Sequence, residues 1–151
     1  MKKGEMLGVA LVIATNAHAG QFDKGGMPYI LHPVSVMQLL DPEYVKEELY
    51  QVIALLHDVI EDTNVTYQEL SEKGISDWAI TAIKALTKQP GQTLDEYKAG
   101  VFANRDAMIV KKADLTHNTD IRRLKGVSEK DLARMAKYQQ FYWEICQEMN
   151  K

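Results

Sequence analysis

The sequence predicts an all-α fold in a single domain of 151 residues. Apolar residues recur at three- and four-residue spacing along most of the chain, and no segment sustains the period-two alternation of a half-buried strand. Recognisable start and stop residues flank several of the apolar segments. No linker, repeat or low-complexity stretch divides the chain, so we expect residues 1–151 to form one compact multi-helix bundle around one core.

The expected helices cover residues 5–19, 33–40, 43–61, 66–72, 76–87, 93–103, 106–125 and 128–149. Asp41-Pro42-Glu43 places proline at the first position of the third helix, where its missing N–H is harmless. The last helix is expected to pack over the rest of the bundle. Residues 21–29, with two glycines and a proline, form the one conspicuous loop, and loops beside rigid helices often contact ligands.

Cap residues support several of these boundaries. Thr66 stands three residues before Glu69, which is the spacing of a capping box. Ser128 offers a hydroxyl cap to the last helix, and acidic residues follow it at the positive end of the helix dipole. Gly74 and Gly126 stand where helices should end.

The first 19 residues allow two interpretations. Lys2 and Lys3, the apolar run after them and the Ala17-His18-Ala19 triplet imitate a signal peptide. We favour a buried first helix, because apolar residues and His18 fall on one helical face and Glu5 interrupts the basic start. On this interpretation His18 is a buried, hydrogen-bonded residue rather than a ligand. No apolar run approaches the roughly 20 residues that span a membrane, so we expect no membrane association.

Charge and cysteine content narrow the function classes. The net charge is −3, which argues against a general nucleic-acid coat and against DNA as a partner. Residues 111–137 nevertheless carry eight basic and four acidic side chains. This local basic segment suits a phosphorylated small molecule, and a solvated helix face explains it equally well. Cys146 is the only cysteine, which favours a reducing, cytoplasmic setting.

The strongest chemical signal lies in residues 55–63. On a helix, His57 and Glu61 are four residues apart, as are Asp58 and Asp62, so the four polar groups share one face. Three carboxylates beside an apolar stripe repel one another, and a divalent cation would relieve that repulsion. The alternative is an exposed acidic helix end with a core histidine, and a lone His-Asp pair does not decide between the two.

Two further segments favour the metal. A glycine-containing loop leads to His32, which precedes Pro33 at an expected helix start. Asp114, His117 and Asn118 lie at three- and four-residue spacing on another helix. Two imidazoles with two carboxylates form a mixed site suited to Mn²⁺, Fe²⁺ or Mg²⁺ rather than to a closed thiolate zinc site. His117 is left open, either as a residue that orients Asp114 or as a helix contact.

The order of these motifs resembles the HD superfamily of metal-dependent phosphohydrolases. More closely, the segments are similar to the hydrolase domain of RelA/SpoT proteins and to the free-standing small alarmone hydrolases of the metazoan SpoT-homologue type. The motifs lie between residues 17 and 125 and read AHAGQ (17–21), KGG (24–26), PYILHP (28–33), HDVIEDT (57–63) and KADLTHN (112–118). On this resemblance the chain is a single HD hydrolase domain, and no synthetase domain is expected.

The resemblance implies a role for each matched residue. The implied metal ligands are His32, His57, Asp58 and Asp114, and the implied metal is Mn²⁺. Glu61 and Asp62 match the pair that positions and activates the attacking water. Lys24 and Asn118 match nucleotide-contacting positions, while Tyr29 is expected to be a packing residue. The implied reaction removes the 3′-pyrophosphate of (p)ppGpp-like alarmones, giving GDP or GTP and pyrophosphate.

The leaving pyrophosphate needs cations, and the sequence offers Lys112, Arg122 and Lys88, for each of which plain surface charge is an equal alternative. Two positions depart from the family. Asp23 stands where many members carry an arginine that contacts the base, and Leu115 stands where many carry a basic residue. The base is therefore open.

The remaining alternatives are an HD phosphohydrolase for ppApp, a dNTP, NADPH or a phosphorylated RNA 3′ end, and a non-catalytic nucleotide-binding module. The intact Glu61-Asp62 pair argues against the module. The oligomeric state is also open.

Overall fold

The computed structural model describes residues 1–151 and is all-helical, which confirms the predicted fold class. Its only extended pairing is an isolated bridge between Phe22 and Pro28. The elements are α1 (Glu5–Ala17), α2 (Leu31–Gln38), α3 (Glu48–Leu56), α4 (Val59–Asp62), α5 (Tyr67–Glu72), α6 (Asp77–Leu86), α7 (Leu94–Phe102), α8 (Arg105–Asn118), the 3₁₀ turn η1 (Ile121–Arg123) and α9 (Glu129–Met149).

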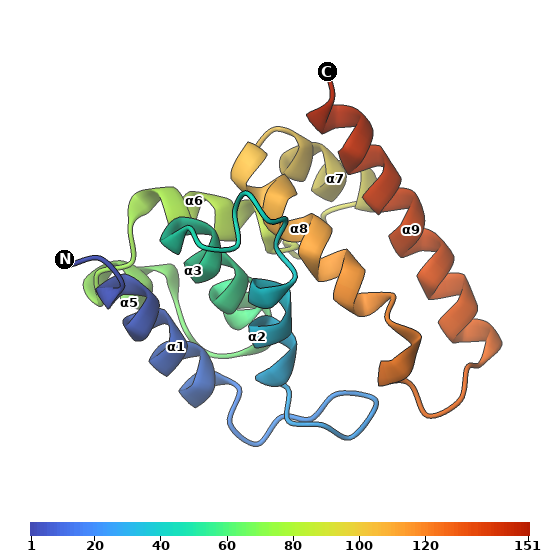
Figure 1. The fold of residues 1–151 in the computed structure, drawn as a ribbon, viewed down its shortest axis with the longest axis horizontal. Helices are drawn as coiled ribbons and strands as arrows, with labels where there is room; N and C mark the ends of the chain where they lie inside the picture. The colour runs from blue at the N-terminus through green and yellow to red at the C-terminus, as the bar shows by residue number, and fades with distance from the viewer.

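Helix α3 is the centre of the molecule. It packs against α1, α2, α6 and α8, and its residues 52–56 have no exposed surface. Five consecutive buried residues mean that the helix is covered all round, as expected of a central core helix. The long α9 lies along α8 at the edge of the bundle and ends beyond it (Figure 1). The buried apolar side chains of all these elements form one connected core.

Three of the predicted boundary residues, Thr66, Ser128 and Gly74, are confirmed, whereas Gly126 lies eight residues beyond the end of α8 and ends no helix. The Thr66 hydroxyl accepts a hydrogen bond from the Glu69 amide at 3.2 Å. Ser128 and Asp131 form a complete capping box at the start of α9, because each side chain accepts from the backbone amide of the other. Gly74 follows α5 with a φ of 94°, a left-handed value that favours glycine.

The predicted helix over residues 43–61 is wrong at its start and near its end. Residues after Pro42 form turns, and α3 begins only at Glu48. The helix then stops at Leu56, and α4 resumes at Val59. The ring Nδ1 of His57 donates to the Ala54 carbonyl at 2.6 Å, so a side chain occupies the acceptor that a continuing helix would offer to a backbone amide.

The predicted helix over residues 106–125 is also too long. Helix α8 ends at Asn118, where the Thr119 hydroxyl donates to the carbonyls of Leu115 and Thr116 and Asp120 takes an extended backbone conformation. The Asp120 carboxylate then accepts from the Arg122 amide and starts η1. Side chains that bond to nearby backbone compete with helix continuation in this way.

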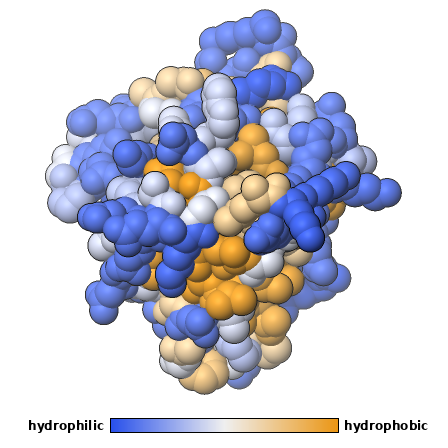
Figure 2. All heavy atoms as spheres, turned by 90° about the vertical axis from the view of Figure 1, so that its left-hand side faces the viewer, coloured by the Kyte–Doolittle hydropathy of each residue, from blue (hydrophilic) through white to orange (hydrophobic).

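Helix α1 covers one side of the bundle and packs on α3, as expected of a buried first helix. That side is the one seen in Figure 2, where an apolar area lies among hydrophilic side chains. Exposed apolar residues on α1 include Leu11 and Val12. None of the helices has the length and apolar character required to cross a membrane.

Candidate metal centre and nucleotide pocket

The four expected metal ligands converge in the core from different helices. His32 lies in the first turn of α2, His57 and Asp58 lie in the break between α3 and α4, and Asp114 lies on α8. The Nε2 atoms of His32 and His57 lie 2.9 and 3.2 Å from Asp114 Oδ1. The same two nitrogens lie 3.7 and 3.1 Å from Asp58 Oδ2. His32, His57 and Asp114 are each less than 5% exposed.

This donor set fits a divalent cation. Nδ1 of His57 already donates to the Ala54 carbonyl, so the neutral ring turns the lone pair of its Nε2 toward two carboxylate oxygens. Lone pairs at such distances repel unless a positive charge lies among them. Burial alone would lower the pKa of His57, yet Asp58 and Asp114 raise it well above its ordinary value. The cluster therefore attracts positive charge, and the chain carries a His/Asp site suited to a divalent metal.

His117 lies beside the centre and contacts His32, not Asp114. The Nδ1 atoms of the two rings are 2.7 Å apart, so one nitrogen must donate and the other accept. Burial, with Arg123 and His32, lowers the pKa of His117 to about 4, which keeps its ring neutral and able to accept. If His32 Nε2 is a ligand, its Nδ1 carries the proton and His117 fixes the orientation of the ring.

Two further residues bond to the acidic ligands, and the sequence reasoning missed both. Tyr29 was expected only to pack, but its hydroxyl donates to Asp58 Oδ2 at 2.6 Å. Lys111 lies three residues before Asp114 on α8, and its Nζ donates to Asp114 Oδ2 at 2.8 Å. Burial would raise the pKa of Asp114, but Lys111 and His57 hold it well below its usual range. The i, i+3 spacing of Lys111 and Asp114 was the available signal.

Glu61 and Asp62 lie at the solvent side of the centre. One carboxylate oxygen from each lies within 4.8 Å of an oxygen of Asp58 and of the other. Glu61 Oε1 accepts a hydrogen bond from the Lys88 amide at 3.0 Å, which holds that carboxylate in place. Burial raises the pKa of both carboxyls above their ordinary values, and the Asp58 charge adds to the effect. Both side chains can reach water, unlike the ligands behind them.

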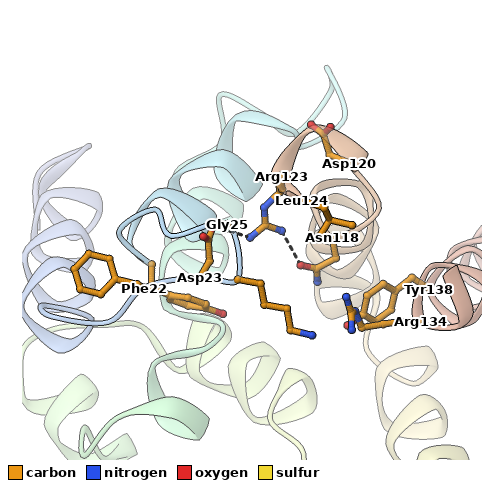
Figure 3. Close-up of a pocket in the computed structure, with 11 residues that line it drawn as sticks. Phe22, Asp23, Gly25, Asn118, Asp120, Arg123, Leu124, Arg134 and Tyr138 are labelled. Atoms are coloured by element: carbon orange, nitrogen blue, oxygen red, sulfur yellow. Dashed lines mark hydrogen bonds and ion pairs between the residues drawn. The ribbon is translucent and has the colours of Figure 1, made fainter. Parts of the chain in front are cut away.

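A pocket of about 290 Å³ opens beside the metal centre (Figure 3). It lies between the loop that precedes α2, the end of α8 with η1, and one face of α9. Its lining residues are Phe22, Asp23, Lys24, Gly25, Tyr29, Asn118, Asp120, Arg123, Leu124, Arg134 and Tyr138. Lys24, Arg123 and Arg134 supply three positive charges, and Asp23 and Asp120 supply two negative ones. The lining is therefore net positive, which suits an anionic ligand.

Of the expected nucleotide contacts, Lys24 and Asn118 both line this pocket. Asn118 also joins the pocket to the metal centre. Its Nδ2 donates to Asp114 Oδ1 at 3.1 Å, and its Oδ1 accepts from Arg123 at 3.1 Å. One amide therefore contacts a ligand of the centre and a cation of the pocket, as the dashed line in Figure 3 indicates for Arg123.

None of the three cations proposed for the leaving group lines this pocket. The Arg122 side chain is 87% exposed and pairs with Asp120. Lys112 pairs with Asp41 at 2.8 Å on another part of α8. Lys88 contacts Glu61 through its backbone amide, and its exposed side chain borders a second hollow that Glu61 also lines. The pocket contains Arg123 in place of Arg122, because η1 turns successive side chains to different sides.

The loop and η1 are in close contact. A Cβ atom at Gly25 would collide with the Arg123 carbonyl oxygen, so only glycine permits this approach. Asp23 Oδ1 accepts from the Met27 amide at 2.9 Å, and Asp23 Oδ2 lies 3.5 Å from Arg123. Burial by itself would raise the pKa of Asp23, but the hydrogen bond from Met27 and the charge of Arg123 lower it below its ordinary value. Of the two positions that depart from the family, Asp23 is held by hydrogen bonds within the loop. Leu115 is buried and does not line the pocket.

Helix α9 contributes Arg134 and Tyr138 to the pocket, which the sequence reasoning did not foresee. The two residues are four apart and so lie on one face of α9. Arg134 is held by Asp131 of the capping box at the start of the helix. This part of the chain follows the last matched motif, so only the i, i+4 spacing of a cation and an aromatic residue could have indicated it.

Comparison with known proteins shows which proteins the chain is similar to. It is 37% identical over 119 residues to the guanosine-3′,5′-bis(diphosphate) 3′-pyrophosphohydrolase of Haemophilus influenzae, a match to 71% of this chain. It is 35% identical over 121 residues to the bifunctional (p)ppGpp synthase/hydrolase SpoT of Escherichia coli K12. It is 33% identical over 140 residues to a GTP pyrophosphokinase of Myxococcus xanthus, a match to 84% of this chain. The matches span only 17–18% of these relatives' lengths.

These relatives show the family, and a solved structure shares the fold. The structure of a metazoan orthologue of SpoT that hydrolyses ppGpp superposes with a TM-score of 0.76 at 20% identity, covering 96% of this chain and 87% of that one. The chain belongs to the SpoT-type HD family. No family model matches it. The fold brings the four expected ligands and the Glu61-Asp62 pair to one site. The pocket beside it contains the expected Lys24 together with Arg123 and Arg134, which were not expected.

Proposed function

We propose that this SpoT-type HD chain hydrolyses the 3′-pyrophosphate of (p)ppGpp-like alarmones, giving GDP or GTP and pyrophosphate. The observation that carries the proposal is the meeting of His32, His57, Asp58 and Asp114 next to Glu61 and Asp62. A binding module has no need of a solvent-facing carboxylate pair beside a buried ligand cluster. The relatives' names support the substrate class, although one of them is named for the opposite reaction.

The four ligands would hold a divalent metal, for which we propose Mn²⁺, with Fe²⁺ or Mg²⁺ as alternatives. Such a metal polarises a phosphoryl oxygen and lowers the pKa of water. The chain matches only part of the length of the relatives named for ppGpp hydrolysis, so the ligand roles and the metal are proposals for this chain. His117, Tyr29 and Lys111 would orient His32, Asp58 and Asp114 through the hydrogen bonds described above.

Glu61 and Asp62 would position the attacking water and take its proton. Both carboxylates reach solvent, and the Lys88 amide fixes Glu61. A carboxylate accepts a proton more readily when its surroundings raise its pKa, as burial does for both residues. The bond from phosphorus to the 3′ oxygen breaks, and that oxygen must gain a proton as pyrophosphate leaves.

The pocket would bind the nucleotide. Lys24, Arg123 and Arg134 can neutralise phosphate charge, and the Tyr138 ring offers a surface for a base or ribose. The Asp23 carboxylate is engaged with backbone and with Arg123, so it is not free to accept an amino group of a base without giving up these bonds. Asp23 therefore does not discriminate between the bases. We propose guanine first, because the relatives are named for guanosine alarmones, and adenine second.

The deciding experiment is turnover of a substrate panel by the purified chain with Mn²⁺. The panel contains ppGpp, ppApp, a dNTP, NADPH and an RNA 3′-phosphate, and products are separated by chromatography. We expect pyrophosphate release from ppGpp. Turnover of another substrate alone would replace the alarmone by that substrate, and nucleotide binding with no turnover would favour the non-catalytic module.

The catalytic pair has its own test. Glu61→Gln combined with Asp62→Asn should reduce turnover by at least about 10³-fold, because general-base catalysis and water positioning are both removed. Metal content, measured on the same protein, should be unchanged. Turnover close to the unsubstituted level would contradict the assigned mechanism.

We also propose a cytoplasmic setting, because Cys146 is the single cysteine and is half-buried.

A further inference from the structure

The AHAGQ motif at the end of α1 supplies no metal ligand and does not line the nucleotide pocket. It nevertheless contacts α4, the four-residue helix that ends in Glu61 and Asp62. A single helical turn is not stable on its own, and its last carbonyls have no partner within the helix. The Gln21 Nε2 donates to one of them, the Asp62 carbonyl, at 3.1 Å.

This hydrogen bond determines the orientation of the Gln21 amide and, through it, the position of the proton on the His18 ring. Because the Gln21 amide nitrogen faces a carbonyl, its Oε1 faces His18 Nδ1, 2.8 Å away. An amide oxygen only accepts, so His18 must carry its proton on Nδ1. Gln21 and His18 therefore form a chain of directed hydrogen bonds from the end of α1 to the end of α4.

The second ring nitrogen of His18, Nε2, shows that packing alone does not explain this histidine. His18 is 2% exposed, and its Nε2 has no hydrogen-bond partner in the protein. Burying a lone pair without a donor is unfavourable, and an apolar side chain of similar size would avoid it. Packing alone therefore does not account for an imidazole at this position, whereas donation from Nδ1 to Gln21 does.

A second set of contacts leads from the same residues to the metal centre. The His18 ring packs against the Tyr29 ring, with centroids 4.9 Å apart. The Tyr29 amide donates to the Gln21 carbonyl at 2.8 Å, and its hydroxyl donates to Asp58. Gln21 thus contacts the turn that carries Glu61 and Asp62. Both Gln21 and His18 contact the tyrosine that holds Asp58.

We propose that His18 and Gln21 are positioning residues, which hold α4 in place relative to the metal centre. This rests on the proposed function only in its kinetic part. A shift of about 1 Å in a reacting group can reduce the rate roughly 10²-fold, so a misplaced α4 should lower kcat. The nucleotide pocket does not include either residue, so KM should change little.

The first test measures amide hydrogen exchange at residues 59–63, which needs no substrate. His18→Leu and Gln21→Ala should each accelerate exchange there about tenfold, the factor expected for loss of one hydrogen bond. Exchange in α6 should not change. Tyr50→Phe is the matched control, because it removes a hydrogen bond to Asp106 away from the site. Unchanged exchange at residues 59–63 would overturn the proposal, whatever the substrate.

The second test measures kcat and KM with the substrate found in the panel. Both variants should lose at least about tenfold in kcat with KM within about twofold, and Tyr50→Phe should lose neither. His18→Asn should restore most of kcat, since its amide nitrogen can replace Nδ1 as the donor. An unchanged kcat, or a loss that His18→Asn does not repair, would overturn the positioning role.

The two tests separate the possible failures. An inactive unsubstituted chain would refute the proposed function, while hydrogen exchange would still decide whether His18 and Gln21 hold α4. Gln21 is half-buried, so Gln21→Ala keeps the test usable if His18→Leu does not fold.

Discussion

The metal centre takes its side chains from α2, from the α3–α4 break and from α8, whereas the nucleotide pocket beside it is formed by a loop, by η1 and by one face of α9. Three of the four ligands in the centre are buried, and each is bonded on at least one side by another residue. The pocket side chains are half-buried or exposed, and Asp120 and Arg134 bond to close neighbours. The proposed metal ligands thus lie on or between packed helices. The residues proposed to bind the nucleotide lie largely on a loop and a short turn, where sequences vary more easily among related proteins.

The largest expected effect concerns the centre. Asp114→Ala removes an oxygen that both imidazoles face, and it leaves the half-buried cation of Lys111 without its partner. Metal content, measured by atomic emission, should fall below one tenth of the unsubstituted value. Turnover should fall by at least about 10³-fold, as expected when a metal is lost from such a site. Full metal content in this variant would show that the four side chains are not the ligand set.

A smaller effect is expected one contact further out. His117→Ala removes the acceptor that orients His32, and we expect metal affinity to fall about 10- to 100-fold. Titration with Mn²⁺, followed by its electron paramagnetic resonance signal, measures this directly. His117→Asn keeps an acceptor and should lose less. Equal affinity in all three proteins would mean that the centre does not depend on this contact.

The pocket is tested by two adjacent arginines. Arg123→Gln removes a cation that lines the pocket, and we expect KM to rise about tenfold, the value of a charge-assisted hydrogen bond. Arg122→Gln is the matched control, because its side chain is exposed and pairs only with Asp120. Its KM should stay within about twofold. A larger effect at Arg122 than at Arg123 would reverse our assignment of the pocket.

The smallest expected effect concerns α9. Ser128→Ala removes the hydroxyl of the capping box, which should lower the free energy of unfolding by about 1 kcal/mol. Chemical denaturation measures that loss. Fraying at the start of α9 also loosens Asp131 and hence Arg134, so KM should rise about two- to threefold. An unchanged KM together with the stability loss would indicate that Arg134 does not contribute to binding.

The sequence predicted the centre better than the pocket, for physical reasons. Metal ligands need particular residue types, so His32 and Asp114 stand out even without coordinates. The broken helix at His57 was not foreseen, because the side-chain bond to Ala54 leaves no trace in apolar periodicity. Cations are common on surfaces, and whether Arg122 or Arg123 enters a pocket depends on the turn of η1. Tyr29 reads as a packing residue because its hydroxyl partner is 29 residues away.

Asn118 connects the two regions that the variants above treat separately. Its amide donates to Asp114 and accepts from Arg123, so the group that steadies a metal ligand also steadies a cation of the pocket. Any free energy that this amide transmits between the two sites is reciprocal. A metal that tightens nucleotide binding by some factor is itself held more tightly by the nucleotide, by the same factor. Under the proposed function, the affinity for the metal is then a property that the substrate concentration can set.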